Sequence, residues 1–310
     1  MTTTDGGSSG TATVPHLRAH AHRVALLVLV IVPLAGFAAA IAWSWASGVV
    51  RPVDLALLAG LYLFTGFGIT AGYHRLFAHA SFRTPTLVRR LLAVAGSMAC
   101  QGPVISWVAA HRRHHSHSDG EDDPHSPHHH GKGLVGLFRG LWHAHLGWLF
   151  GARDLQLERW APDLLAEPAL ARIDRGFLLW VALGLALPAG IGFSVDPGWR
   201  GALLGLLWGG LARIFLVQHV TWSVNSVCHV FGTRPYRSRD LSTNNLPCAL
   251  LSLGEGWHNN HHAFPASARH GLGRWQLDLT WLLIHALEKI GLASDVRLPS
   301  AREKAAKAQP

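Results

Sequence analysis

Gly254-Glu255-Gly256-Trp257-His258-Asn259-Asn260-His261-His262 is the stretch around which the rest of this 310-residue chain is organised. Read as a helix, it places three histidines at i, i+3 and i+4, and residues at that spacing share one face. The same spacing recurs upstream in His111-Arg112-Arg113-His114-His115, and a looser pair consists of His74 and His79. Neutral imidazole is a good ligand for iron, zinc, copper and nickel. Eight imidazoles exceed what one ion binds, so the three boxes predict two metal ions.

Isolated histidines are usually ordinary core or surface residues, but two H-x-x-H-H clusters in one chain are difficult to explain in that way. Six neighbouring imidazoles would repel one another if they were charged, which favours neutral rings that bind a metal. No Asp or Glu lies inside any box. The pattern therefore differs from the Glu-x-x-His pattern of carboxylate-rich di-iron bundles.

Long apolar runs set the fold class. The chain is 49% hydrophobic and only 15% charged, whereas soluble domains are about 25% charged. Helices of about 20 apolar residues are long enough to cross a bilayer. We therefore predict an all-α membrane protein whose four spans form two hairpins beneath a His-rich helical cap. The spans are expected at about 24–46, 55–73, 176–195 and 201–220.

The basic residues predict the orientation of these spans. With four spans, 24 of the 27 Lys and Arg residues fall on the side that also carries all three boxes. Because positive loops stay in the cytoplasm, we expect the boxes and both termini to be cytoplasmic in the cell inner membrane. Arg213 and His219 lie inside the last predicted span and should face protein or a cavity, since charges are costly in lipid. A nucleic-acid partner is not indicated, because no basic stripe with interleaved aromatic residues occurs.

Domain boundaries follow from the same patterns. We expect one membrane domain over 24–292, between a disordered segment at 1–23 and a frayed tail at 293–310. Three cysteines without a C-x-x-C pair give no sign of a disulfide framework. Segments near Leu87–Met98 and Leu134–Trp160 are expected to lie at the membrane interface, and Leu272–Leu292 to form an amphipathic cap.

Two further segments bear on the metal site. The acidic loop from Asp119 to Asp123 either orients ligand imidazoles from behind, as bound histidines commonly require, or is a solvated loop. His229 is the natural ninth ligand. Asn225 lies four residues before it on the same helical face and is expected to reach a metal directly or through water.

Together these motifs resemble the integral-membrane fatty acyl desaturases, in particular the Δ9 acyl-CoA desaturase group of bacterial type without a fused cytochrome b5. The order H-x4-H, H-x2-H-H, N-x3-H and H-x2-H-H carries the resemblance, with Gly72-Tyr73-His74-Arg75-Leu76 and Gly232-Thr233-Arg234-Pro235-Tyr236 as supporting text. It extends from about Leu61 to Leu292. It implies an oxidoreductase of lipid metabolism that uses O2 to introduce a cis double bond into a saturated acyl chain.

The resemblance also implies site residues and cofactors. Two iron ions would be held by nine histidines, with Asn225 acting through water: His74, His79, His111, His114, His115, His229, His258, His261 and His262. A bent acyl tunnel would be lined at its kink by Gln101, Trp107 and Thr221. The animal enzymes hold the CoA head group with Asn and Arg-Asp, where this chain has Gly102, Ala109 and Ala110. A CoA thioester remains the first choice of substrate, followed by a phospholipid-bound or carrier-protein-bound chain.

Two other functions share the main features. A membrane di-iron hydroxylase of alkanes or lipids would have the same boxes, and a His-rich metal transporter would combine spans with metal ligands. Transporters place their ligands near the bilayer midplane. The first three predicted spans do not support metal ligands at that depth. The chain carries no haem, iron–sulfur or dinucleotide motif, so the two electrons of each turnover are expected from a separate ferredoxin or rubredoxin with its reductase.

Overall fold

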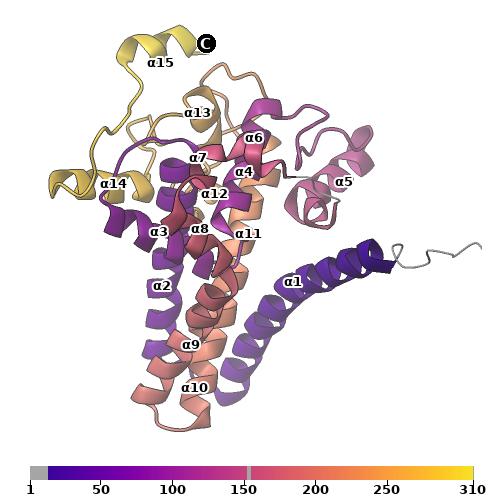
Figure 1. Ribbon diagram of the computed structural model, residues 1–310, viewed down its shortest axis with the longest axis vertical. Helices are drawn as coiled ribbons and strands as arrows, with labels where there is room; N and C mark the ends of the chain where they lie inside the picture. Colours follow the sequence, from indigo (N-terminus) through magenta and orange to yellow (C-terminus); the bar gives the residue numbers. More distant parts are fainter. Residues whose placement is uncertain (1–12, 152–154, 310) are drawn as a thin grey trace, which may run out of the picture.

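The computed structural model describes residues 13–151 and 155–309, with side chains from residue 24 onward. Within these ranges the chain is helical, and isolated backbone bridges such as Arg83–Ser294 take the place of strands. A helical bundle forms one half of the molecule and a compact helical cap the other (Figure 1). The predicted all-α class is therefore confirmed.

Four helical stretches of the bundle are long and apolar enough to cross a membrane: Val24–Ser47, Pro52–Ala78, Phe177–Val195 and Trp199–His229. They are built from α1 (Thr13–Ser47), α2 (Pro52–Phe67) with the π-helix η1 (Gly68–Ala78), α9 (Phe177–Val195), and α10 (Trp199–Gly205) with the π-helix η3 (Leu206–Ala212) and α11 (Arg213–Ser226). All four predicted spans are thus found. The second and fourth run beyond their predicted ends, into the cap.

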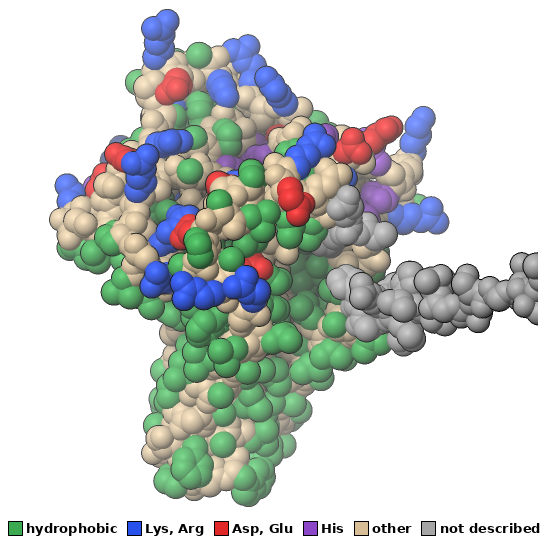
Figure 2. Space-filling view, in the orientation of Figure 1, with side chains coloured by type: hydrophobic (Ala, Val, Ile, Leu, Met, Phe, Trp, Pro, Cys, Tyr) green, Lys and Arg blue, Asp and Glu red, His purple; other side chains and the backbone are tan. Residues whose placement is uncertain are grey.

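The cap contains the shorter helices. They are α3 (Thr86–Met98), α4 (Val104–His117), α5 (Gly133–His145), η2 (Gly147–Phe150), α6 (Leu157–Trp160), α7 (Pro162–Leu165), α8 (Pro168–Arg175), η4 (Val227–His229), α12 (Leu246–Leu251), α13 (His258–Ala263), α14 (Leu279–Lys289) and α15 (Ala301–Lys307). Figure 2 shows hydrophobic side chains over the bundle and most Lys, Arg, Asp and Glu side chains over the cap. This division matches the segregation of charge predicted from the sequence.

Arg51 joins the two hairpins at the bundle end remote from the cap. Its guanidinium lies 2.7 Å from the carboxylate of Asp54 at the start of α2, and 2.7 Å from that of Asp196 after α9. Arg213, within the fourth span, is fully buried and donates to the carbonyls of Met98 and Gly184. Arg213 therefore faces protein, as predicted for a charge inside a span.

Close packing of η1 against α3 brings the first box into the cap. A Cβ atom on Gly68 would lie 2.2 Å from the backbone nitrogen of Gly96, and one on Gly96 would lie 2.3 Å from the Tyr73 ring. Only glycine fits at such an approach. The π-helical turn is a feature often found at functional sites. Here it ends at Ala78 with His79 as its C-cap, so both histidines of the box lie at the cap end of the span.

Both ends of the chain depart from the predicted boundaries. Residues 1–12 lie outside the described part, but α1 already begins at Thr13, within the segment expected to be disordered. Beyond Pro15, which suits a first helical turn, this stretch contains no further proline or glycine to break the helix.

The tail predicted to be frayed is ordered instead. A Ser300–Glu303 capping box starts α15, which stabilises an N-terminus by satisfying backbone donors. Lys307 donates through Nζ to the Ala263 carbonyl at the end of α13, 2.5 Å away. Gln309 donates its backbone N–H to the Pro235 carbonyl at 2.8 Å. Polarity alone suggested a loose end, whereas contacts with distant residues fix it.

Candidate metal centre

Nine histidines from four separate segments converge in the cap. η1 and the residue that follows it, His79, supply the first box; α4 supplies the second, η4 the isolated histidine and α13 the third. They form two groups in which the candidate ligand atoms all lie within 4.8 Å of one another. The five-histidine group consists of His74, His79, His111, His115 and His261, and the four-histidine group consists of His114, His229, His258 and His262. These are the nine histidines singled out in the sequence.

The Nε2 atoms point into each group. In the five-histidine group, His261 Nε2 lies 3.0 Å from that of His74 and 2.9 Å from that of His115. In the four-histidine group, His258 Nε2 lies 3.0 Å from the Nε2 atoms of both His229 and His262. Ligands bound at about 2.1 Å to one ion stand roughly 3.0–3.4 Å apart at neighbouring corners. The imidazoles present therefore fit a metal ion in each group.

The i, i+3, i+4 spacing does more than place three rings on one face. In α4, His111 and His115 belong to the five-histidine group, whereas His114 belongs to the other. In α13 the division is reversed, since only His261 joins the five-histidine group. The rings of His115 and His262, one from each group, lie 4.4 Å apart. The second and third boxes thus each contribute to both groups, whereas the first box contributes only to the five-histidine group, and the two groups lie side by side.

Carboxylates hold four of the rings from behind, through Nδ1. The distances are 2.5 Å from Glu255 to His74, 3.0 Å from Asp123 to His114, 2.9 Å from Asp119 to His229 and 2.6 Å from Asp240 to His262. A carboxylate at Nδ1 fixes the tautomer and leaves Nε2 free for a metal. The acidic loop therefore orients ligands, as one of the two readings of the sequence proposed.

The sequence patterns did not identify two of these carboxylates, Glu255 and Asp240, as partners of the histidines. Glu255 lies three residues before His258, the first histidine of the third box, and this proximity was an available signal. Asp240 lies more than twenty residues before its partner His262, in a loop without regular structure, so no spacing could have indicated it.

Burial keeps most of the rings neutral. Desolvation, with a further contribution from neighbouring imidazoles, lowers the pKa of His111, His115, His258 and His261 well below the ordinary histidine value. For His262, burial outweighs the neighbouring Asp240 carboxylate, and its pKa falls to about 4. Metals bind the unprotonated ring, so these five rings are in the form that binding requires. The pKa of His114 is raised instead, because the Asp123 carboxylate outweighs burial.

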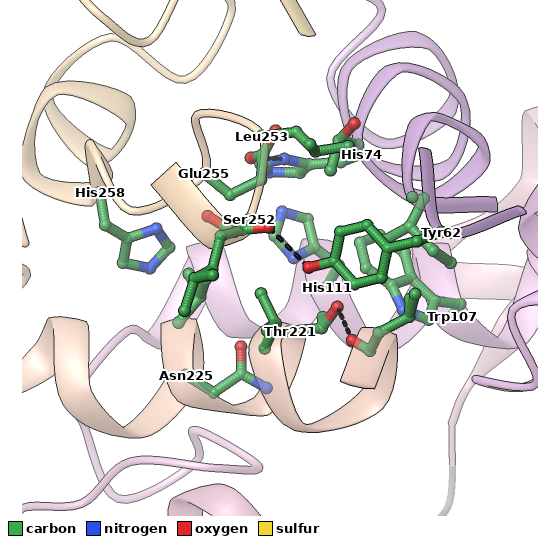
Figure 3. A pocket seen from close by; sticks show the side chains of 17 residues that line it. Tyr62, His74, Trp107, His111, Thr221, Asn225, Ser252, Leu253, Glu255 and His258 are labelled. Carbon is green, nitrogen blue, oxygen red and sulfur yellow. Dashed lines mark hydrogen bonds and ion pairs between the residues drawn. The ribbon is translucent and has the colours of Figure 1, made fainter. Parts of the chain in front are cut away.

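An apolar cavity leads to this centre between α2–η1 and α11. Its walls include Ile69, Val217, Val220, Val224 and Leu253. His74 and His111 of one group and His258 of the other line it as well. Figure 3 shows these rings around the same space as the polar side chains along α11. The cavity is suited to an apolar chain that runs up to both histidine groups.

The residues predicted for the tunnel lie at this cavity. Trp107 and Thr221 line it (Figure 3). Gln101 stands behind this lining, where its amide donates to the Thr221 hydroxyl at 2.9 Å. Asn225 lines it as well, near His258. Tyr62 also lines the cavity, although the sequence did not indicate it. Its hydroxyl donates to the carbonyl of Leu251, another lining residue, at 2.6 Å.

Comparison with known proteins agrees with this geometry. The family model described as "Fatty acid desaturase" matches residues 52–293. A hex-5-enoyl-[acyl-carrier protein] acetylenase of Moorena producens is 44% identical over 88% of this chain and 85% of its own length. An sn-1 stearoyl-lipid 9-desaturase of Anabaena variabilis is 41% identical over 84% and 88%. An acyl-CoA C20 Delta5-desaturase of Anemone leveillei is 40% identical over 79% and 74%.

The matched region spans the second to fourth membrane helices and every histidine of the two groups. The chain belongs to the fatty acid desaturase family, as a membrane protein with a His-rich candidate metal site.

Proposed function

We propose that the protein is an O2-dependent di-iron desaturase that introduces a cis double bond, at Δ9, into a saturated fatty acyl chain. One observation carries the proposal: an apolar cavity is lined by imidazoles of both histidine groups. An acyl chain in this cavity would lie with one pair of methylenes beside both ions.

The donor set supports two divalent ions. The nine histidines of the two groups are the proposed ligands, with Asn225 acting through water. Four carboxylates stand directly behind the rings, and their negative charge equals the positive charge of two divalent ions. When bound, iron with O2 and two electrons supplies an oxidant strong enough for an unactivated C–H bond, which no side chain can provide.

The protein's own part in the reaction is positioning. The cavity walls exclude water and hold the chain, and the Gln101–Thr221 pair with Trp107 defines where the chain bends. A displacement of about 1 Å at the reacting carbons can cost roughly a hundredfold in rate. We therefore assign regiochemistry to Gln101, Trp107 and Thr221, rather than to the metal ligands.

For the acyl carrier we propose a CoA thioester. The relative from Anemone leveillei acts by name on acyl-CoA, whereas those from Anabaena variabilis and Moorena producens act by name on a lipid and on a carrier protein. The CoA proposal is tested by supplying the same saturated chain in all three forms to purified protein. Fastest desaturation of the lipid-bound or carrier-bound chain would overturn it.

Replacing Trp107 with alanine should broaden the product spectrum. Its indole stacks on His111 with ring centroids 5.0 Å apart and lines the cavity, so its removal opens space beside the chain. We expect positional isomers in place of one alkene, about a tenfold to hundredfold lower rate, and unchanged iron content. Trp142, which is 62% exposed on α5, provides the matched control as Trp142→Ala. A single unaltered isomer from the Trp107 variant would contradict the assignment.

We propose that a separate reduced protein, such as a ferredoxin or rubredoxin served by its reductase, docks on the cytoplasmic face of the cap. Basic side chains are abundant over the cap (Figure 2), and opposite charges would steer an acidic donor toward it. Turnover at sub-saturating donor should fall as the Debye length is shortened by salt from about 30 to about 8 Å. The assay uses detergent without anionic lipid, and a rate independent of salt would refute steering.

Expression in a desaturase-deficient bacterial host tests the proposed function. Mass spectrometry of its fatty acids should show a cis alkene that is absent from cells carrying the empty vector. An alcohol in place of the alkene would instead establish the alternative of a hydroxylase.

A further inference from the structure

A tenth histidine, His270, lies beside the five-histidine group without belonging to it. Its side chain is fully buried, and it comes from the loop that follows α13 rather than from a box. Its ring centroid lies 4.4 Å from that of His261 and 5.3 Å from that of His74. It therefore contacts two members of the group at once.

Glu255 connects His270 to the group through a single oxygen. Oε2 lies 2.5 Å from His74 Nδ1 and 3.2 Å from His270 Nδ1, while Oε1 accepts from Arg75 at 3.0 Å. One carboxylate oxygen thus faces a histidine of the first box and His270 together.

The backbone of His270 is held as firmly as its side chain. The Asp278 carboxylate accepts the backbone N–H groups of His270 and Gly271, at 2.7 and 3.0 Å. Asp278 is itself paired with Arg75 at 3.0 Å, and Asn260 of α13 donates to the His270 carbonyl at 2.7 Å. Because its backbone is anchored and its side chain is fully buried, the His270 ring is held in one orientation.

Three buried ring nitrogens of these two histidines lack hydrogen-bond partners among the described residues. They are His261 Nδ1 and both ring nitrogens of His270, although the Glu255 carboxylate lies 3.2 Å from His270 Nδ1. A metal-bound histidine almost always donates its second ring N–H to an acceptor, and four of the nine rings have a carboxylate in that place. The His270 ring, which contacts that of His261, carries unpartnered nitrogens as well.

We propose that His270 is a positioning residue of the metal centre, which accepts the Nδ1 proton of His261 and donates its own Nδ1 proton to Glu255. This inference rests on the proposed metal centre. His270 then links His261 to the carboxylate that orients His74, so two ligands of the five-histidine group are set by one network.

Metal binding by purified protein tests the proposal without turnover. Co2+ is titrated against a competing chelator, and its visible absorption reports the geometry of the bound ion. His270→Phe keeps a ring but removes both nitrogens, whereas His270→Gln keeps one donor and one acceptor. We expect the Phe variant to bind one of two Co2+ ions about 10–100-fold more weakly, with a shifted spectrum. The Gln variant should stay within about threefold of the wild type, well below that range.

The control is His285→Phe, because His285 lies on the exposed part of α14, where it pairs with Glu288 and stacks on Trp281, outside both histidine groups. Wild-type affinity and spectrum in the His270→Phe protein would show that the ring merely packs, and would overturn the proposal. If the Phe variant does not fold, the Gln variant decides: near-wild-type binding supports the proposal, and a loss of about tenfold or more overturns it. Wild-type protein that binds no Co2+ would instead refute the metal centre itself.

Discussion

Changing His261 to alanine is expected to abolish desaturation and to release at least one of two metal ions. His261 stands at the middle of the five-histidine group, with its Nε2 atom within 3.0 Å of those of His74 and His115. Loss of a residue behind a ligand costs about 10–100-fold in metal affinity, and loss of a ligand itself should exceed that range. Iron per chain in anaerobically purified protein, measured by mass spectrometry, checks the result.

The matched control is His285→Ala, which removes an exposed imidazole of α14 that lies outside both groups. This variant should retain wild-type iron and turnover. Full iron and full turnover in the His261 variant would contradict the assignment of the five-histidine group as a metal site.

Changing Arg75 to methionine is expected to destabilise the protein by about 3–5 kcal/mol, the cost of breaking a buried ion pair by removing one partner. The Arg75 side chain is fully buried, with Glu255 and Asp278 each 3.0 Å from Nη2. It also donates to the Ala268 carbonyl at 2.7 Å. Its loss leaves two carboxylates without a cation in a site closed to water.

Unfolding in detergent, followed by circular dichroism, measures the effect. Arg90→Met provides the control, because Arg90 lies exposed on α3. Exposed substitutions of this kind usually change stability by no more than about 0.5 kcal/mol. Equal stability of the two variants would show that the Arg75 network adds nothing to the fold.

Much of the molecule could be predicted because its main signals are local. A bilayer span is a property of about 20 consecutive residues, and the i, i+3, i+4 spacing of a box lies within five. The spans near 24–46 and 176–195 and the nine histidines therefore appear where the sequence indicated. The number of histidines in the boxes predicted two metal ions, which stays a prediction, but it did not indicate that the second and third boxes would each divide between both groups.

What the sequence did not indicate depends on contacts between distant residues. His74 meets Glu255 across 181 positions, and no local pattern marks that pair. His270 and Asp240 lie in irregular loops, and their roles follow only from what the fold brings against them. The tail from 293 onward appeared loose for the same reason, because its partners Ala263 and Pro235 are remote in the chain.

Product analysis with purified, iron-loaded protein tests the central claim most directly. A saturated acyl chain, a reduced electron donor and O2 are supplied together, and the lipid is examined by mass spectrometry. The proposed function predicts a cis alkene that has lost two hydrogens, formed only when O2 is present. A hydroxylated chain, or an alkene that forms equally well without O2, would contradict it.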